Sequence, residues 1–485
     1  MAVARSAVVR CAAFSGRWLW LILCVLAVLS ESRADEVLLS DVVMRTADGE
    51  QRLAGRVVAE GAAGELLLED PAGRMRQLSA AEVVGREDRR GVWQVRCAAF
   101  SGRWLWLILC VLAVLSESRA DEVLLSDEVL LSDVVMRTAD GEQRLAGRVV
   151  AEGAAGELLL EDPAGRMRQL SAAEVVGRED RRGQWQPADA EQLGRLLKTE
   201  AGSGFEVYQT EHYLVCSNCS EGYNEFIGRL LETVYAQYFD FWKKLNVDVA
   251  SAGRPLPVLM FQSESEFQAY ASRIHPETGF EGVPGFYSVR DNLVLVVDLT
   301  GDRSLREVSA VRKKLADRPL QVATVVHEAV HQLSFNSGLQ QRFADFPVWY
   351  SEGLSLYFEP PSERSAVLWS RPGQVSPRHH PEFVRLVRDE TLPVPLADLL
   401  VNDSAFQSAD AAVAAYAESW GLVSYLVKKK PLEFAEYARR LQRLQPLQAV
   451  TGSARQQMFT EAIGETPAEL SGRLIPWVRR LRVAR

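Results

Sequence analysis

Two histidines, His327 and His331, stand four residues apart in an otherwise apolar stretch, and no other segment constrains the fold as strongly. Residues 321–333 predict a helix, with Pro319 in its first turn and Gly338 as its stop signal. Val325, Val326, Ala329, Val330 and Leu333 surround the two histidines, so this helix is expected to face the core. Burying two imidazoles among apolar side chains costs free energy unless they are paired or liganded. The fold must therefore supply partners for both histidines.

Residues four apart share one face of a helix, so His327 and His331 can reach a single metal ion. Glu328 is turned by about 100° from His327 and can address a water activated by the metal instead. The chain has only 6 histidines, which makes a chance HExxH pattern uncommon. We predict that the histidines bind Zn²⁺ and that Glu328 is a general base. The alternative, a helix with two surface histidines, fits the apolar setting less well.

A catalytic zinc ion needs a third protein ligand and leaves one position open. Residues 347–359, PVWYSEGLSLYFE, predict a second helix, and the distance along the chain from His331 to Glu352 leaves room for a loop that turns back. We predict Glu352 as the third ligand. Glu359 shares a helix face with Glu352 and can accept a hydrogen bond from a ligand histidine. The other interpretation of Glu359 is a solvated helix end.

These motifs carry a resemblance to a known family. HEAVH followed by WYSEG resembles the gluzincin metallopeptidases, and FNSGLQ with PVWYSEGLSLYFE is similar to a family of exported, peptidase-MA-like proteins of largely unassigned function. The similarity covers about residues 200–485 and is most specific at 321–359. It implies a zincin-like fold in which the zinc ligands are His327, His331 and Glu352 and the base is Glu328.

A tyrosine downstream of the third ligand stabilises the oxyanion in aminopeptidase-like gluzincins, and by this resemblance Tyr416 suits that role. Its other interpretation is a core tyrosine on an amphipathic helix. The GxMEN signature of the aminopeptidases is absent from the sequence, so the similarity does not imply cleavage at an amino terminus. Endo- and exo-cleavage both stay open.

The implied function is zinc-dependent hydrolysis of peptide bonds, with a peptide or protein as the substrate. The alternative is a non-catalytic zinc-binding envelope protein that uses the peptidase-like fold as a binding scaffold. A net charge of -9 and a pI near 5.5 argue against nucleic acid as a partner, because neutralising phosphates needs a basic surface.

Upstream of the first metal-binding helix, residues 205–300 predict an α+β region. Strands are expected at 205–216 and 256–261, and a long helix at 223–245. Gluzincins bind extended substrate along a sheet edge, and the resemblance makes residues 292–297 our candidate for that edge. The predicted substrate contacts are Asn292, Val294 and Leu295. The continuous apolar character of this run fits a buried central strand equally well.

The remaining histidines and cysteines have weaker patterns. Cys216 and Cys219 form a CxxC, which in an exported chain indicates a local disulfide or two free thiols. The adjacent His379 and His380 lie in a proline-rich stretch and are predicted to be surface residues. His212 and His275 have no ligand-like spacing. Residues 381–485 are expected to be helical, with Pro476 kinking or breaking the last helix.

The N-terminus has the pattern of a signal peptide. Arginines precede an apolar run at 18–29, and Ser32, Arg33 and Ala34 form a cleavage-like site. An apolar helix of this length spans about 18 Å, which is shorter than the roughly 30 Å hydrocarbon core. We predict a cleaved peptide and export to the periplasm, cell envelope or extracellular space. The alternative is an uncleaved or lipid-assisted anchor.

Part of the sequence is duplicated without change. Residues 9–41 recur as 95–127 and residues 42–91 as 134–183, with an extra EVLLSD at 128–133. Complete identity indicates recent copying, or an event in assembling the sequence, and no selection for two functions. The copied apolar segment is a second processing site, a weakly buried segment, or the true start of the protein after a false extension.

The repeated unit predicts a small β module that suits an SH3-like barrel, because short apolar strands alternate with glycine-containing turns. It is either a wall- or peptide-binding module or a structural appendage. The whole chain is thus expected to be α+β, a zincin-like domain with a helical C-terminal part, preceded by repeated β modules. The predicted segments are a signal peptide at 1–34, β modules at 35–94 and 121–186 around a signal-like segment at 95–120, the zincin-like domain at 190–380 and a helical subdomain at 381–485.

Overall fold

A computed structural model describes residues 36–46, 49–60, 66–69, 75–78, 83–92, 128–138, 141–277, 279–280, 282–298 and 300–483. The chain divides into two units, Met1–Glu122 and Val123–Arg485, and each is described by itself. The predicted signal peptide at 1–34 and the apolar segment at 95–120 lie outside the described residues. Among the helices of the described ranges, none has the length and apolar composition needed to cross a membrane.

The first unit contains one antiparallel five-stranded sheet in the order β4-β3-β2-β1-β5. The fifth strand pairs with the first, so the meander folds back on itself. The strands are β1 (Glu36–Thr46), β2 (Gly49–Glu60), β3 (Leu66–Glu69), β4 (Met75–Leu78) and β5 (Val83–Val92). The prediction of β structure in this repeat is confirmed.

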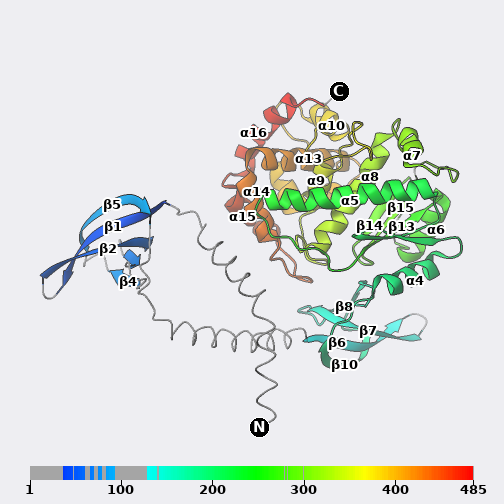
Figure 1. The fold of residues 1–485 in the computed structure, drawn as a ribbon, viewed down its shortest axis with the longest axis horizontal. Coiled ribbons are helices and arrows are strands. Elements are labelled where there is room, and N and C mark those ends of the chain that lie inside the picture. The colour runs from blue at the N-terminus through cyan, green and yellow to red at the C-terminus, as the bar shows by residue number, and fades with distance from the viewer. Residues whose placement is uncertain are drawn as a thin grey trace, which may run out of the picture. The chain divides into compact units, whose positions relative to one another are not determined.

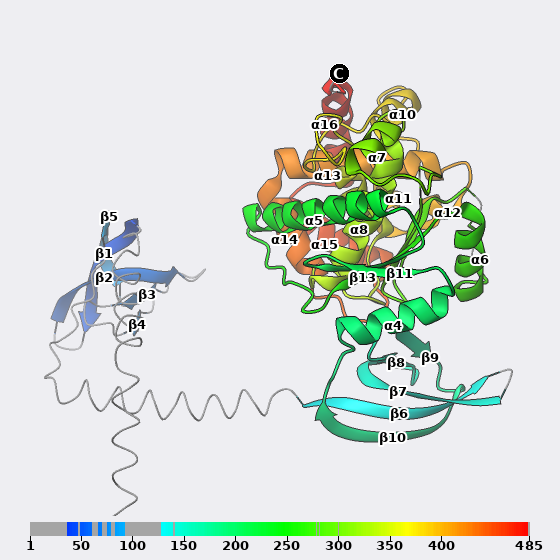
Figure 2. The same ribbon diagram turned by 45° about the vertical axis from the view of Figure 1, so that its right-hand side comes forward.

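The second unit begins with the second copy of the module, whose strand order β10-β6-β7-β8-β9 is the same. Its small core consists of Val134, Leu158, Leu160 and Leu170. In Figure 2 this module lies beside helix α4 (Ala190–Ala201), which begins at a capping box formed by Asp189 and Gln192. The strands are β6 (Glu128–Thr138), β7 (Gly141–Glu152), β8 (Leu158–Glu161), β9 (Met167–Leu170) and β10 (Val175–Gln184).

A third sheet has the order β11-β12-β13-β15-β14, with three parallel strands inside and an antiparallel strand at each edge. The prediction that residues 292–297 form the sheet edge is wrong, because β15 lies between β13 and β14. The edge strand next to β15 is β14, which has four residues. The strands are β11 (Glu206–Gln209), β12 (Tyr213–Ser217), β13 (Leu256–Phe261), β14 (Gly285–Ser288) and β15 (Leu293–Val297).

Helices cover both faces of this sheet. Alternate residues of β15 face opposite sides, so Val294 joins the core under α5 and α8, whereas Leu295 joins the core under α4 and α6. Figure 1 shows the long helix α5, which together with α8 covers one face of the sheet. The helices of this part are α5 (Glu221–Lys244), α6 (Glu264–Ile274), α7 (Val308–Leu315), α8 (Pro319–Asn336) and α9 (Val348–Phe358).

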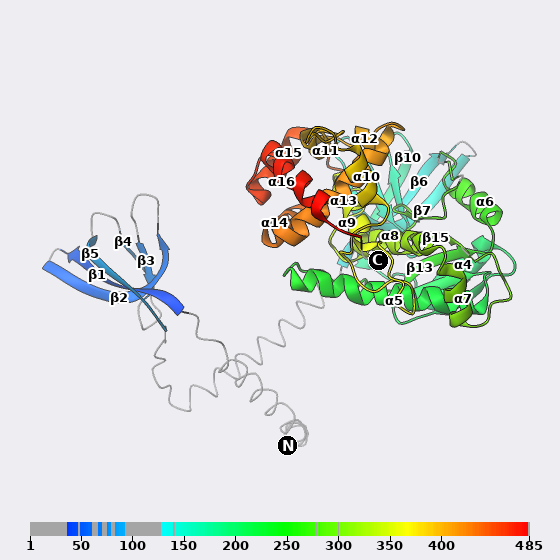
Figure 3. The same ribbon diagram turned by 90° about the horizontal axis from the view of Figure 1, so that it is seen from above.

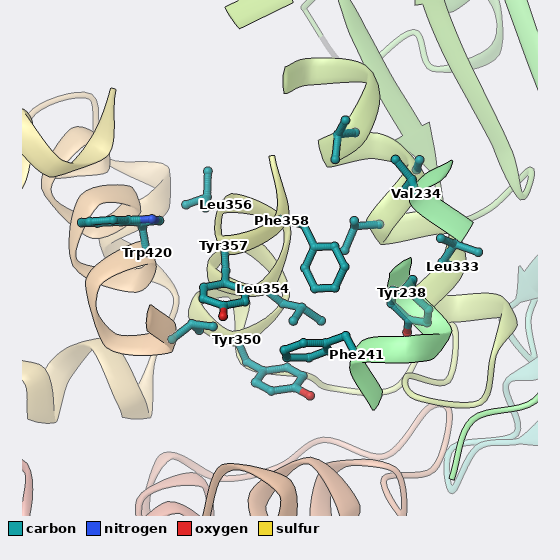
Figure 4. Close-up of a cluster of buried hydrophobic side chains, with 14 of the residues drawn as sticks. Val234, Tyr238, Phe241, Leu333, Tyr350, Leu354, Leu356, Tyr357, Phe358 and Trp420 are labelled. Carbon is teal, nitrogen blue, oxygen red and sulfur yellow. The ribbon is translucent and has the colours of Figure 1, made fainter. Parts of the chain in front are cut away.

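Aromatic side chains fill the space between α5 and α9, as Figure 4 shows. The ring of Phe358 lies 5.9 Å from that of Tyr238 and 5.2 Å from that of Phe241. Such edge-to-face and tilted pairs add to the free energy of burial and fix the relative positions of the helices. The core therefore holds α9, which carries Glu352, in a defined place relative to the sheet.

The C-terminal part is helical, as predicted, and Figure 3 shows α14 to α16 beyond α13 on the side away from the β11–β15 sheet. The last helix continues through Pro476, so the predicted break is absent; a capping box at Thr466 starts this helix and its apolar face is buried. The helices are α10 (His379–Leu386), α11 (Leu396–Val401), α12 (Ser404–Gln407), α13 (Ala412–Lys429), α14 (Pro431–Leu441), α15 (Gly452–Ile463) and α16 (Pro467–Arg480).

A buried carboxylate joins the second module to the rest of its unit. Glu161 is 1% exposed and forms ion pairs with Arg148 of the module at 2.5 Å, Arg254 at 2.9 Å and Arg342 at 3.1 Å. Burial would raise the pKa of Glu161, but the charges of the three arginines outweigh it and hold the pKa below its usual value. Met167 also donates its backbone N–H to the carbonyl of Arg290 at 2.7 Å. The second module is therefore packed against the domain by specific polar contacts.

We expect Glu161→Gln to destabilise residues 123–485 by on the order of 3 kcal/mol, because it leaves buried guanidinium groups without their counter-charge. Thermal and urea unfolding of the full chain would measure this. Glu69 occupies the identical position in the first copy, so Glu69→Gln is a matched control and should leave that transition in place. Equal effects of the two substitutions would contradict this assignment.

Candidate metal centre

Two helices bring the three predicted ligands together. Helix α8 places His327 and His331 one turn apart, and α9 presents Glu352 to both. The Nε2 atom of His327 lies 3.1 Å from Nε2 of His331 and 3.2 Å from Oε2 of Glu352. Nε2 of His331 lies 3.4 Å from Oε1 of Glu352. The side chains come from segments separated in sequence, yet their donor atoms converge on one point.

These separations fit a tetrahedral zinc site. Ligand atoms at 2.0–2.1 Å from a tetrahedral ion are about 3.3 Å apart. The group consists of two imidazoles and one carboxylate. This is the donor set of a catalytic zinc site, which leaves a fourth position for water or substrate. The chemistry and spacing of His327, His331 and Glu352 therefore fit Zn²⁺, and these three residues are the candidate ligands.

The same contacts shift the proton affinities of the ligands. Burial would lower the pKa of His327, but hydrogen bonds to Glu352 and Glu359 raise it well above its usual value. Burial would likewise raise the pKa of Glu352, yet the charges and hydrogen bonds of His331 and His327 hold it far below. A proton on His327 competes with a metal ion for this imidazole. Metal binding is therefore expected to tighten as the pH rises.

Glu359 lies behind the ligands rather than in solvent. Its Oε2 atom is 2.9 Å from Nδ1 of His327, on the opposite side of the imidazole from Glu352. This contact fixes the orientation of the ring and leaves Nε2 directed at the metal position. This placement is compatible with the predicted role of Glu359 as a hydrogen-bond partner of a ligand histidine. The alternative interpretation, a solvated helix end, is not compatible with it, because Glu359 is only 7% exposed.

His379 also belongs to this network, which sequence reasoning missed. It was expected at the surface, but it is 6% exposed at the start of α10, and its Nε2 lies 3.3 Å from Oε1 of Glu359. The surface prediction is wrong, because α10 packs on α13 and its first residue, His379, contacts Glu359 at the end of α9. The signal available in the sequence was the scarcity of histidine in the chain.

Glu328 is held at the sheet edge. The backbone N–H of Tyr287 on β14 donates to Oε2 of Glu328 at 2.8 Å. Burial raises the pKa of Glu328, and the charges of His327 and His331 oppose this rise. The carboxylate therefore borders the ligands without joining the three converging donor atoms.

Tyr416 reaches the same site from α13. A cavity of about 590 Å³ is lined by His327, His331, Glu328, Glu352 and Tyr416. Burial, followed by the charges of Glu352 and Glu328, raises the pKa of Tyr416 to about 12. Helix α13 can approach α9 closely because of Gly353, where a Cβ atom would stand 2.7 Å from the carbonyl oxygen of Ser419. The structure thus places Tyr416 beside the ligands.

The three predicted substrate contacts lie elsewhere. Asn292, Val294 and Leu295 are at most 1% exposed. Asn292 has φ 52 in the turn between β14 and β15, and its amide side chain bonds to Asn336 of α8. Val294 packs toward α5 and α8, and Leu295 packs toward α4 and α6 on the other face of the sheet. All three side chains are therefore enclosed by the fold and do not line the cavity at the candidate metal centre.

The other histidines and the cysteines have separate partners. His212 pairs with Glu232 at 2.7 Å, and His275 lies 3.0 Å from the hydroxyl of Ser288. Cys216 and Cys219 are both free thiols, and burial raises the pKa of each to about 12. None of these groups adds a donor to the three converging atoms.

Comparison with known protein families gives one match. Residues 321–448 match a family described as "Protein of unknown function (DUF1570)". The match includes His327, Glu328, His331, Glu352 and Tyr416. No curated protein matches the chain.

We expect Glu359→Gln to weaken zinc binding about 10–100-fold, because the amide no longer holds His327 with a negative charge. Competition with a chromophoric chelator would measure the affinity. Glu363→Gln, an exposed acidic position four residues further on, serves as the control. An unchanged affinity in Glu359→Gln would show that this carboxylate does not support the ligand.

Proposed function

We propose that this chain is a zinc-dependent hydrolase of peptide bonds, of the gluzincin type, with a zincin-like catalytic domain. The observation that carries the proposal is the convergence of His327, His331 and Glu352 at tetrahedral spacing with Glu328 beside them. Two neutral imidazoles and one carboxylate are the donor set of catalytic zinc, and the adjacent carboxylate supplies a base.

Bound zinc would polarise a scissile carbonyl and make a water more acidic. The protein's own residues then move the protons. Glu328 takes a proton from the attacking water and returns it to the leaving amine, because its carboxylate borders the cavity. Burial raises the pKa of Glu328, which makes the carboxylate a stronger base. The N–H of Tyr287 keeps the carboxylate in place throughout.

Tyr416 supplies a hydrogen bond to the developing oxyanion in this mechanism. Its pKa of about 12 keeps the phenol protonated near neutral pH, so it can donate. The ring of Phe406 packs against it at 5.3 Å and restricts its position. A donor fixed before the reaction contributes more than one that must reorient.

The surroundings of the catalytic domain belong to the same proposal. The chain is exported to the periplasm, cell envelope or extracellular space, and its partner is a peptide or protein substrate. Pairing of the fifth strand with the first supports an SH3-like barrel for each β module. The alternative function is a non-catalytic zinc-binding scaffold, which would need the ligands but not Glu328.

Glu328→Gln is expected to reduce peptide hydrolysis about 10²–10⁴-fold while the protein still binds zinc, because an amide cannot accept the proton. Rates on casein and on quenched-fluorescent peptides, together with zinc content, would measure this. Full activity in a zinc-loaded Glu328→Gln protein would overturn the hydrolytic mechanism and favour the scaffold.

Tyr416→Phe should lower kcat about 10²–10³-fold with little change in KM, because the hydrogen bond forms chiefly in the transition state. Tyr425→Phe is the control, since Tyr425 lies on the same helix and packs against Trp477 instead. If both variants keep the parental kcat, Tyr416 does not stabilise the oxyanion.

A further inference from the structure

A second cavity adjoins the candidate metal centre along β14. Its volume is about 490 Å³, within the range of ligand pockets. It shares lining residues with the cavity that holds the candidate metal ligands, so the two cavities are adjacent. The shared residues are Val283, Phe286, Tyr287, Val289 and Phe343.

The walls of this second cavity are mainly apolar. The rings of Phe280 and Phe286 lie 4.7 Å apart and form one side. The polar groups beside them already have partners: His275 lies 3.3 Å from Asp291, and Arg290 bonds to the same carboxylate at 3.2 Å. Few unpaired polar groups face an occupant, so a charged side chain would lose its hydration without compensation. The cavity suits a large apolar side chain.

Phe343 stands between the two cavities in a strained conformation. Its φ is 64, a region that bulky residues rarely adopt. A contact with the C-terminal part holds it there, because the N–H of Leu447 donates to the carbonyl of Phe343 at 2.9 Å. Among the described residues its ring stacks on no other ring. Strain of this kind persists where the surrounding structure maintains it and is concentrated at binding sites.

The strand between the cavities can align an extended chain. β14 pairs with β15 on one side and with no strand among the described residues on the other. The N–H of Tyr287 points from this open side toward Glu328. A peptide placed along the open side would have its backbone beside Glu328 and successive side chains on alternate faces. One of these side chains can then enter the second cavity.

We propose that the cavity formed by Phe280, Phe286 and Phe343 binds a large apolar side chain, aromatic above all, of the peptide substrate. The inference rests on the proposed peptide hydrolysis and adds the substrate class to it. Phe343 is the specificity-determining residue, because its ring lines the cavity and does not belong to the hydrophobic core clusters of the second unit. Its substitution should alter the choice of substrate more than the folding of the chain.

The test uses the full chain loaded with zinc and pairs of quenched-fluorescent peptides that differ only in Phe or Ser at one position. That position is moved along the peptide, and mass spectrometry maps each cleaved bond. We expect kcat/KM for the Phe peptide to exceed that for the Ser peptide about 10–200-fold, with cleavage at a fixed distance from Phe. Phe343→Gly should lower this ratio at least about 5-fold, and it should fold, because glycine adopts a positive φ without strain.

Phe239→Ala provides the matched control, since it removes a phenylalanine ring that lines neither cavity. Its ratio should equal that of the parent. A ratio near one in the parent, with both peptides cleaved, would overturn the pocket and leave the hydrolase intact. The same holds if Phe343→Gly keeps the parental ratio.

Failure to cleave any peptide despite bound zinc would instead refute the proposed function. The pocket would then be decided by fluorescence anisotropy of the same labelled peptides with Glu328→Gln protein. Tighter binding of the Phe peptide, lost in the Phe343→Gly double variant, would support the pocket. Equal affinity for the two peptides would reject it.

Discussion

The pairing of one imidazole with two carboxylates fixes the candidate site. His327 contacts Glu352 through Nε2 and Glu359 through Nδ1, and both acids lie on one face of α9. Sliding α9 by one turn, about 5.4 Å, would break both contacts at once. Glu359 also sits at the C-terminal end of α9, where the helix dipole disfavours a negative charge. The imidazoles of His327 and His379 offset that cost, so the position of α9 and the charges of the site depend on each other.

The edge hairpin depends on the same helix. The amide of Asn292 bonds to Asn336 of α8, and the hydroxyl of Tyr287 donates to Asn292 at 2.8 Å. The backbone of Tyr287 in turn positions Glu328. The turn of this hairpin also receives the N–H of Met167 from the β module. One set of contacts thus connects the module, the sheet edge and Glu328, which gives the module a physical route to influence the candidate site.

Local patterns in the sequence predicted the elements that carry the ligands. Periodicity located α8, and the bounds predicted for β13 agree with the structure. Local patterns could not predict the order of the strands. The strand β14 has only four residues, Gly285–Ser288, and its pairing with β15 depends on contacts between segments that are distant in sequence. His379 was missed for a similar reason, since its burial depends on the packing of α10 and α13. Pro476 shows that a well-capped, well-packed helix can tolerate a residue that disfavours it.

The strands of the two modules differ in sequence only at Val92 and Gln184. Comparing the modules therefore shows which features depend on local sequence and which depend on position in the chain. Leu39 pairs with Arg56 in the first copy, and Leu131 pairs with Arg148 in the second, so the strand register is the same in both. Two of the partners of Glu161, Arg254 and Arg342, lie outside the repeat and occur once. Only five residues, 185–189, connect β10 to α4, and so short a tether makes docking of the second copy intramolecular at high effective concentration. Burial of Glu161 therefore follows from where this copy stands in the chain, because its own sequence is no different from that of the first.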